Sequence, residues 1–258
     1  MVRYIRHISD YIVLCCFGLN ESIFLRKEKR DMSVNDNNET KVILPFEYGE
    51  DEHYYVEKLG EIPAKPVYSF LKRCIDVVGS VFGLIICFIP MLVIAAAIKL
   101  TSPGKVFYSQ ERLGLNGEKF MLIKFRTMRT DAEKSGAQWS KGKADDRITP
   151  IGAFLRKTRI DELPQLWLCL TGKLSLVGPR PERGVFYDEF EKHIHGFSER
   201  LKVKPGLTGL AQVCGGYDLR PEEKVVYDVE YIKKRSIFLD IKILFMTVGV
   251  ILNHDGAR

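Results

Sequence analysis

The sequence predicts an α+β fold in which one apolar helix attaches a domain of mixed helices and strands to a membrane. Residues 77–98 are 22 consecutive residues without a charge, and at about 1.5 Å per residue such a helix reaches across the hydrocarbon core of a bilayer. Residues 105–109 and 119–126 have the composition of strands and flank a glycine-containing turn at 114–117. Apolar residues return at helical spacing between 237 and 252, as in a core helix or an amphipathic helix at a membrane surface.

Composition and charge narrow the class of protein. At 258 residues, with 46% hydrophobic and 28% charged residues, the chain is long enough for one core and is typical of a globular protein. The formal charge is +6, yet the segment from Ser33 to Pro63 holds eight acidic residues and two lysines, so the remainder is more strongly basic. A basic surface favours nucleic acid, anionic lipid or phosphorylated substrates as partners. The six cysteines include no C-x-x-C pair, which indicates neither a zinc site nor a disulfide framework and favours a cytoplasmic setting.

Three regions are expected along the chain. Residues 1–66 are predicted to be an N-terminal extension and linker, largely unstructured. The apolar stretch Tyr11–Leu19 is too short to span a bilayer, and the acidic segment that follows is interrupted by prolines. Residues 67–104 are predicted to form a membrane-embedded helical hairpin, and residues 105–258 a cytoplasmic catalytic domain.

The apolar segment has basic residues on both sides, Lys72 and Arg73 before it and Lys99 and Lys105 after it. The rule that favours lysine and arginine in the cytoplasm therefore draws both ends to the same side. Pro90, near the middle, removes a backbone donor and predicts a bend. A re-entrant helix, broken at the proline, satisfies both observations. A single kinked span and a buried helix of a soluble protein are the alternatives.

An adjacent carboxylate pair, Asp161 and Glu162, is the strongest candidate for chemistry. Thr158 is expected to begin a helix over 160–167, as Thr149 begins the preceding one, so the pair lies in a first turn. Free backbone N–H groups and the helix dipole favour anions there, which keeps Asp161 ionised and attracts a phosphate. An ionised aspartate can act as a nucleophile or hold a divalent cation. The alternative is structural, since Thr158-x-x-Asp161 resembles a capping box, whose acid only satisfies a backbone N–H.

Basic residues around this pair suit a phosphate ligand. Arg156 lies just before it, and Arg180 lies between two prolines that restrict the backbone and present the guanidinium with little orientational freedom. Strand alternation places Lys124 and Arg126 on one face, although such residues are often only solvated. The turn that ends at Gln212 contains two glycines, which permit a nucleotide or sugar to approach the backbone closely.

Four motifs in order carry a resemblance: Lys-Phe-Arg-Thr-Met over 124–128, Arg-Ile-Asp-Glu-Leu-Pro-Gln-Leu over 159–166, Leu-Val-Gly-Pro-Arg-Pro-Glu over 176–182 and Lys-Pro-Gly-Leu-Thr-Gly over 204–209. Together they closely resemble the bacterial sugar transferase family, the monotopic polyprenyl-phosphate phosphoglycosyl transferases. The similarity runs from about Ser69 to the C-terminus.

The resemblance implies an enzyme bound to the bacterial inner membrane at its cytoplasmic face. Such an enzyme moves a sugar-1-phosphate from a UDP-sugar to undecaprenyl phosphate with Mg²⁺ as cofactor, releases UMP, and so starts an exopolysaccharide or capsule repeat unit. Carried over, Asp161 is the nucleophile that forms a covalent phosphosugar intermediate. Glu162 assists it, and both carboxylates hold the magnesium. Arg180 binds phosphate, and Arg156 and Lys124 line the pocket.

The resemblance also bears on the membrane segment. The family's re-entrant helix breaks at a Ser-Pro pair, whereas this chain has Ile89-Pro90, so the serine that would mend the backbone hydrogen bonding is absent and the proline remains.

Two other classes of function were weighed. A membrane-tethered regulatory protein could retain this fold and only bind nucleotide-sugar or polysaccharide enzymes, but the intact Asp161–Glu162 pair argues against it. A nucleic-acid partner is not expected, because no aromatic stacking platform or recognition helix is evident. The sequence names neither the sugar nor the oligomeric state, and it is compatible with an oligomer.

Overall fold

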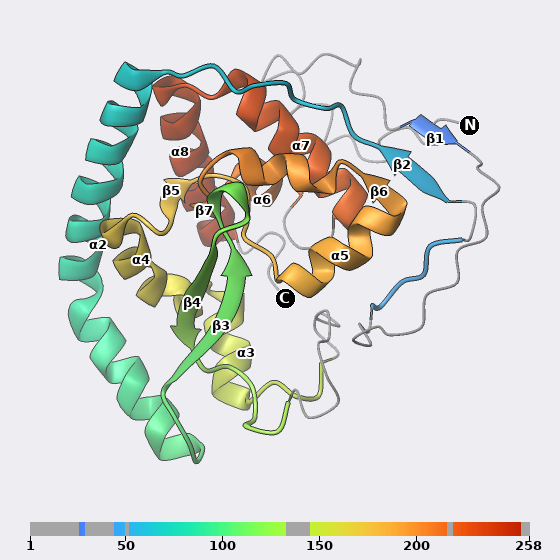
Figure 1. Ribbon diagram of the computed structural model, residues 1–258. Coiled ribbons are helices and arrows are strands. Elements are labelled where there is room, and N and C mark those ends of the chain that lie inside the picture. Colours follow the sequence, from blue (N-terminus) through green and yellow to red (C-terminus); the bar gives the residue numbers. More distant parts are fainter. Residues whose placement is uncertain (1–25, 29–43, 50–51, 133–144, 216–218, 254–258) are drawn as a thin grey trace.

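The computed structural model describes residues 26–28, 44–49, 52–132, 145–215 and 219–253 (Figure 1). The predicted mixture of helices and strands, with one long apolar helix, is confirmed. The apolar stretch within residues 1–25 lies outside the described residues. In chain order the elements are β1 (Arg26–Glu28), β2 (His53–Tyr55), α2 (Pro66–Thr101), β3 (Phe107–Leu113), η1 (Leu115–Gly117), β4 (Lys119–Phe125), α3 (Pro150–Lys157), η3 (Ile160–Gln165), α4 (Leu166–Thr171), β5 (Ser175–Val177), α5 (Gly184–His193), β6 (Ile194–His195), η4 (Phe197–Lys202), β7 (Gly206–Thr208), α6 (Leu210–Cys214), α7 (Pro221–Lys234) and α8 (Ile237–Asn253).

The apolar segment forms helix α2, which runs down one side of the molecule in Figure 1. Among the described residues it is the one helix long and apolar enough to cross a membrane. The structure differs from the predicted hairpin over 67–104, because α2 continues through Pro90 as a single helix. The domain supports it on both sides of the proline, with Leu84 packed against the main core and Met91 against a second cluster of Ile98 and Phe125.

The two faces of α2 differ in what they meet. On the inner face, Asp76 is buried and accepts hydrogen bonds from the Ser175 hydroxyl and the Leu176 N–H, while Ile98 is fully buried near the other end. The outer face exposes large apolar side chains: Val67, Phe70, Leu71, Val78, Val81, Phe82, Ile85, Ile86, Phe88, Ile89, Leu92, Val93 and Leu100. One face of α2 therefore packs against the domain, and the part of the chain that the structure describes leaves the other face exposed.

Strands β3 and β4 form the predicted hairpin, although β3 begins and ends later than the sequence suggested. The strands are antiparallel, with Tyr108 opposite Lys124. The turn is tight because Asn116 and Gly117 both adopt positive φ, 54° and 79°. The period of two then places Tyr108, Lys124 and Arg112 on the same face of the hairpin.

The main core lies behind this hairpin. Strand β5 is fully buried and pairs in parallel with β7. Gly206 and Gly209 do permit close backbone approach, but to the chain itself: a Cβ on Gly206 would lie 2.1 Å from the Gly178 nitrogen, and one on Gly209 2.2 Å from the Gly178 oxygen. These two glycines are needed for packing.

The C-terminal helix α8 buries one face and exposes the other, as an amphipathic surface helix does. Asp240 and Ile243 are buried, whereas Phe238, Phe245 and Leu252 are each at least 70% exposed. Its exposed face is apolar, like that of α2.

Residues 44–49 and 52–65, here called the N-terminal strap, pack against the domain, so the structure differs from the predicted loose extension over this part. Strand β2 pairs in parallel with β6, and Leu59 is buried in the main core. The Tyr48 hydroxyl donates to Glu222 on α7 at 2.9 Å. Apolar and aromatic side chains between the acidic ones give the strap enough burial to order it.

Candidate active site

The adjacent carboxylates lie in the 3₁₀ helix η3, directly after α3. Thr149 caps α3 as predicted, accepting a hydrogen bond from the Gly152 N–H. Thr158 does not begin the next helix: it ends α3, and its hydroxyl donates to the Phe154 carbonyl at 2.9 Å. Arg159 then takes the left-handed conformation, with φ 58°, and turns the chain into η3. The capping-box explanation of Asp161 is therefore wrong.

The two carboxylates have different partners. Both side chains are buried, with Asp161 6% and Glu162 8% exposed. Arg180 grips Glu162 with both terminal nitrogens, Nη2 at 2.5 Å from Oε1 and Nη1 at 3.3 Å from Oε2. Among the residues that the structure describes, none forms a hydrogen bond or ion pair with the Asp161 carboxylate. Glu162 is fixed in place, and Asp161 is available to a ligand.

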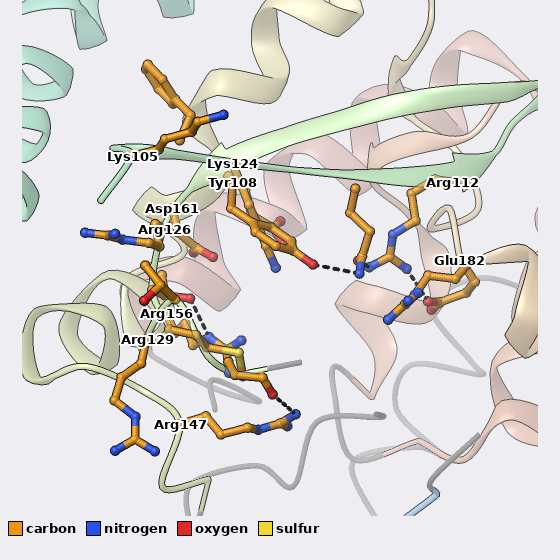
Figure 2. A pocket seen from close by; sticks show the side chains of 18 of the residues that line it. Lys105, Tyr108, Arg112, Lys124, Arg126, Arg129, Arg147, Arg156, Asp161 and Glu182 are labelled. Carbon is orange, nitrogen blue, oxygen red and sulfur yellow. Dashed lines mark hydrogen bonds and ion pairs between the residues drawn. The ribbon is translucent and has the colours of Figure 1, made fainter. Parts of the chain in front are cut away.

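Both carboxylates line a pocket of about 380 Å³ whose walls are strongly cationic (Figure 2). The structure brings six of the seven sequence candidates together here: Asp161, Glu162, Arg180, Arg156, Lys124 and Arg126. The seventh, Gln212, is not among the lining residues. It is buried in α6, where its Nε2 donates to the Leu207 carbonyl at 3.0 Å.

Burial and charge set the protonation of the pocket. Burial and the neighbouring Glu162 raise the pKa of Asp161 to about 7, against the opposing effect of Lys124, Arg156 and Arg180. Burial alone would also raise the pKa of Glu162, but Arg180 outweighs it and the pKa is lowered. Burial lowers the pKa of Lys124 to about 8, although Asp161 opposes that shift. Glu162 is thus ionised at neutral pH, while Asp161 and Lys124 titrate near neutrality.

Arg126 and Arg156 are both tied to nearby protein groups. Arg126 donates to the Pro103 carbonyl at 2.5 Å and to the Ser102 hydroxyl at 2.7 Å, which fastens β4 to the end of α2. Arg156 donates from Nε to the Thr127 hydroxyl at 3.0 Å. The phosphate-binding role of each stays a prediction.

Sequence reasoning missed several lining residues. Arg112 on β3 donates to Glu182 at 2.9 Å and shares a strand face with Tyr108 and Lys124. The alternation that singled out Lys124 would have included Arg112 once the hairpin register was known. Other polar lining residues that were not predicted include Lys105, Gln110, Arg129, Arg147, Arg183 and Lys224, which come from five separate segments of the chain.

The carboxylate pair is compatible with a magnesium ion. Mg²⁺ prefers oxygen ligands and is commonly held by one or two carboxylates together with substrate phosphates. The described part of the chain has no group of three or more histidine, cysteine, aspartate or glutamate side chains that could hold a metal by themselves. Asp161 and Glu162 would supply the protein oxygens, and the phosphates of a ligand would supply others.

The chain is similar in sequence to known proteins. Residues 67–254 match the bacterial sugar transferase family. Over 210 residues the chain is 40% identical to a UDP-N-acetylgalactosamine-undecaprenyl-phosphate N-acetylgalactosaminephosphotransferase of Aeromonas hydrophila, covering 80% of this chain and 49% of that protein. It is 41% identical over 208 residues to a UDP-galactose-lipid carrier transferase of Erwinia amylovora, covering 75% of this chain and 43% of that protein. It is 38% identical over 210 residues to the UDP-glucose:undecaprenyl-phosphate glucose-1-phosphate transferase of Escherichia coli K12, covering 76% and 45%.

The chain spans about half the length of these curated relatives. The matched region contains α2, the carboxylate pair and every element that lines the pocket. On this evidence the chain belongs to the bacterial sugar transferase family.

Proposed function

We propose that this protein transfers a sugar-1-phosphate from a UDP-sugar to undecaprenyl phosphate and releases UMP, the first step of an exopolysaccharide, capsule or related glycoconjugate. The observation that carries the proposal is the buried Asp161 carboxylate, which has no hydrogen-bond or ion-pair partner among the described residues, beside a glutamate held by Arg180 in a cationic pocket. The names of the relatives support the reaction class. They specify three different sugars, so the sugar stays open.

The proposed reaction has two displacements at one phosphorus atom. A carboxylate oxygen of Asp161 attacks the β-phosphorus of the UDP-sugar, the bond from that phosphorus to the bridging oxygen breaks, and UMP leaves. A phosphate oxygen of undecaprenyl phosphate then attacks the same phosphorus, which releases the Asp161 carboxylate and forms the lipid diphosphate sugar. Covalent catalysis of this kind divides one difficult transfer into two easier ones.

The side chains around Asp161 have distinct proposed roles. Phosphoryl transfer requires mainly positioning and neutralisation of negative charge. Lys124, Arg156 and Arg180 bring positive charge to the carboxylate pair, as their opposing effects on the pKa of Asp161 indicate. A bound Mg²⁺ would supply further charge neutralisation on the phosphate oxygens. Glu162, fixed by Arg180, would orient that ion and keep Asp161 in line with the phosphorus.

We further propose that α2 enters the cytoplasmic leaflet and does not cross the bilayer. Asp76 near its start and Ile98 near its end both contact the same folded domain. If α2 crossed the bilayer, the part of the domain that packs against it between these two residues would have to lie within the hydrocarbon core, which is about 30 Å thick. The apolar outer faces of α2 and α8 then lie in lipid, and the pocket opens at the cytoplasmic face of the inner membrane.

The direct test is UMP release by detergent-purified protein from a panel of UDP-sugars with undecaprenyl phosphate and Mg²⁺. Release with one sugar, abolished in Asp161→Asn and retained in the exposed control Asp188→Asn, is the expected result. No release with any sugar from folded wild-type protein would favour the regulatory function. Full activity in Asp161→Asn would instead show that another group is the nucleophile.

A further inference from the structure

The segment that carries Arg180 is held almost entirely through its backbone. Pro179 and Pro181 lack N–H groups, so the segment has few donors of its own. The Gly178 N–H donates to the Thr208 carbonyl at 2.8 Å, and the Pro179 carbonyl accepts from the Gly206 N–H at 2.9 Å. The segment is thereby fastened to β7.

Three cationic side chains bind the remaining carbonyls from three directions. Lys72 of α2 donates to the Val177 carbonyl at 2.9 Å, and Arg112 of β3 to the Pro181 carbonyl at 3.3 Å. Arg200 of η4 donates from Nη2 to the carbonyl of Arg180 itself at 3.0 Å. Arg200 therefore contacts the backbone of Arg180, the residue that forms the ion pair with Glu162.

Arg200 is unusually rigid for an arginine. Its side chain is 1% exposed, and Nη2 also lies 2.6 Å from Oδ2 of Asp228 on α7. The guanidinium carbon lies 4.9 Å from the ring centre of Phe197 and 5.9 Å from that of Tyr187. The ion pair and the two rings enclose the guanidinium, while its Nε and Nη1 are buried without a hydrogen-bond partner among the described residues.

A buried ion pair adds little net stability compared with well-packed apolar residues, because desolvation offsets the attraction between its charges. Its placement therefore points to a role in position. We propose that Arg200, paired with Asp228, is a positioning residue: it fixes the backbone of Arg180 so that the guanidinium grips Glu162 and leaves the Asp161 carboxylate free. The expected effect on kcat rests on the proposed function. The expected effect on the position of Arg180 rests on the geometry alone.

The first experiment is a double-mutant cycle on UMP release. Arg200→Met keeps the bulk of the stem and removes the donor, and we expect kcat to fall on the order of 10- to 100-fold, as for a misplaced catalytic group. In an Arg180→Ala background the same substitution should change kcat less than about twofold, because its effect passes through Arg180. An equal loss in both backgrounds would overturn the proposal.

Two further variants separate positioning from loss of fold. Val229→Ala leaves a cavity at a buried position of α7, adjacent in sequence to Asp228, and we expect it to lower stability with kcat nearly unchanged. Arg200→Lys keeps the cation beside Asp228 and should be folded, with a kcat between those of wild type and Arg200→Met. A fully active Arg200→Met protein would contradict the positioning role.

A second readout does not depend on activity. Phenylglyoxal modifies arginine side chains, and its reaction at Arg180 can be followed by mass spectrometry of proteolytic peptides from the full chain. We expect Arg180 to react several-fold faster in Arg200→Met than in wild type or Val229→Ala. If wild type releases no UMP, the proposed function fails while this rate still decides the positioning role. An unchanged rate would refute that role.

Discussion

The two adjacent carboxylates differ because, among the described residues, Glu162 forms an ion pair with an arginine and Asp161 does not. The paired Glu162 stays ionised, whereas the pKa of Asp161 rises to about 7 through burial and through the charge of Glu162 beside it. A nucleophilic carboxylate must be ionised. Lys124 favours the ionised form of Asp161 only while the lysine itself is protonated, and the pKa of Lys124 is lowered to about 8. The reactivity of Asp161 should therefore change with pH near neutrality.

We predict a bell-shaped pH dependence of kcat/KM for UMP release. The rate should rise with pH as Asp161 ionises near pH 7 and fall above about pH 8 as Lys124 loses its proton. In Lys124→Met the falling limb should disappear. The rising limb should move to higher pH, because the cation that lowers the pKa of Asp161 is gone. A Lys124→Met profile that keeps both limbs of the wild type would contradict these assignments.

Candidate site residues that belong to a sequence motif could be predicted from the sequence. The residues with which they form hydrogen bonds and ion pairs could not. Asp161, Glu162 and Arg180 meet in the pocket as expected. The grip of Arg180 on Glu162 depends on the path of the intervening α4 and β5, and the buried Arg200 depends on contacts across 20 residues. Gln212 lies away from the pocket lining because the glycines before it serve packing between β5 and β7.

At the scale of elements, helices α2 and α8 are joined by one buried polar cluster. Lys72 of α2 contacts Asp240 of α8 at 2.9 Å, and the hydroxyls of Tyr68 and Tyr231 also donate to Asp240. Both helices expose apolar outer faces, so this cluster connects the two surfaces that are proposed to lie in lipid. Lys72 also donates a hydrogen bond to the Val177 carbonyl, which connects this polar cluster to the start of the segment that carries Arg180.

We predict that Lys72→Met lowers the free energy of unfolding in detergent by about 3 kcal/mol, since it leaves a buried carboxylate without its cation. Adding Asp240→Asn should restore part of the loss. Lys119→Met removes an exposed pair with Glu111 and should cost less than about 1 kcal/mol. A double variant less stable than Lys72→Met alone would show that the ion pair is not what holds the helices together.

The N-terminal strap is the element that sequence reasoning placed least well. Its acidic composition and prolines predict a loose linker, whereas Leu59 enters the main core and the Leu59 N–H donates to Glu199 at 2.8 Å. A segment in which charged and apolar residues alternate has the composition of a disordered linker. It is recognised as ordered only when the protein surface against which its apolar residues pack is known. The surface is formed by α7, η4 and β6, far away in sequence.

We predict that removal of residues 1–43 leaves stability and UMP release close to those of the full chain, and that removal of residues 1–65 lowers the unfolding midpoint clearly. Leu59→Ala should account for about 2 kcal/mol or more of that difference. Thermal unfolding of the full chain, the two truncated proteins and Leu59→Ala in the same detergent measures these differences. Equal midpoints for the two truncations would mean that the strap does not stabilise the domain.

For the molecule as a whole, the continuous contact between α2 and the domain determines how it meets the membrane. Sequence reasoning identified the apolar segment and its basic flanks, and predicted both ends on one side. It did not predict an unbroken helix, because the packing of α2 on both sides of Pro90 comes from the rest of the fold. The domain and its anchor are therefore one folded unit.

We predict that single cysteines placed at the exposed residues Glu61 and Thr101, one beyond each end of the apolar segment, are both protected from a membrane-impermeant maleimide in intact spheroplasts. Both should react once the membrane is permeabilised. The parent protein measures the background from native cysteines. Labelling of one site alone in intact spheroplasts would establish a spanning helix.

In the proposed mechanism Asp161 carries the phosphosugar, and the most direct test is the mass of the protein during turnover. Purified protein is mixed with its UDP-sugar and Mg²⁺ without lipid acceptor, quenched within seconds and digested. We expect a sugar-phosphate mass on the peptide that contains Asp161, absent in Asp161→Asn and lost when undecaprenyl phosphate is added before the quench. Absence of any adduct, together with UMP release that occurs only when acceptor is present, would show direct transfer and contradict the covalent mechanism.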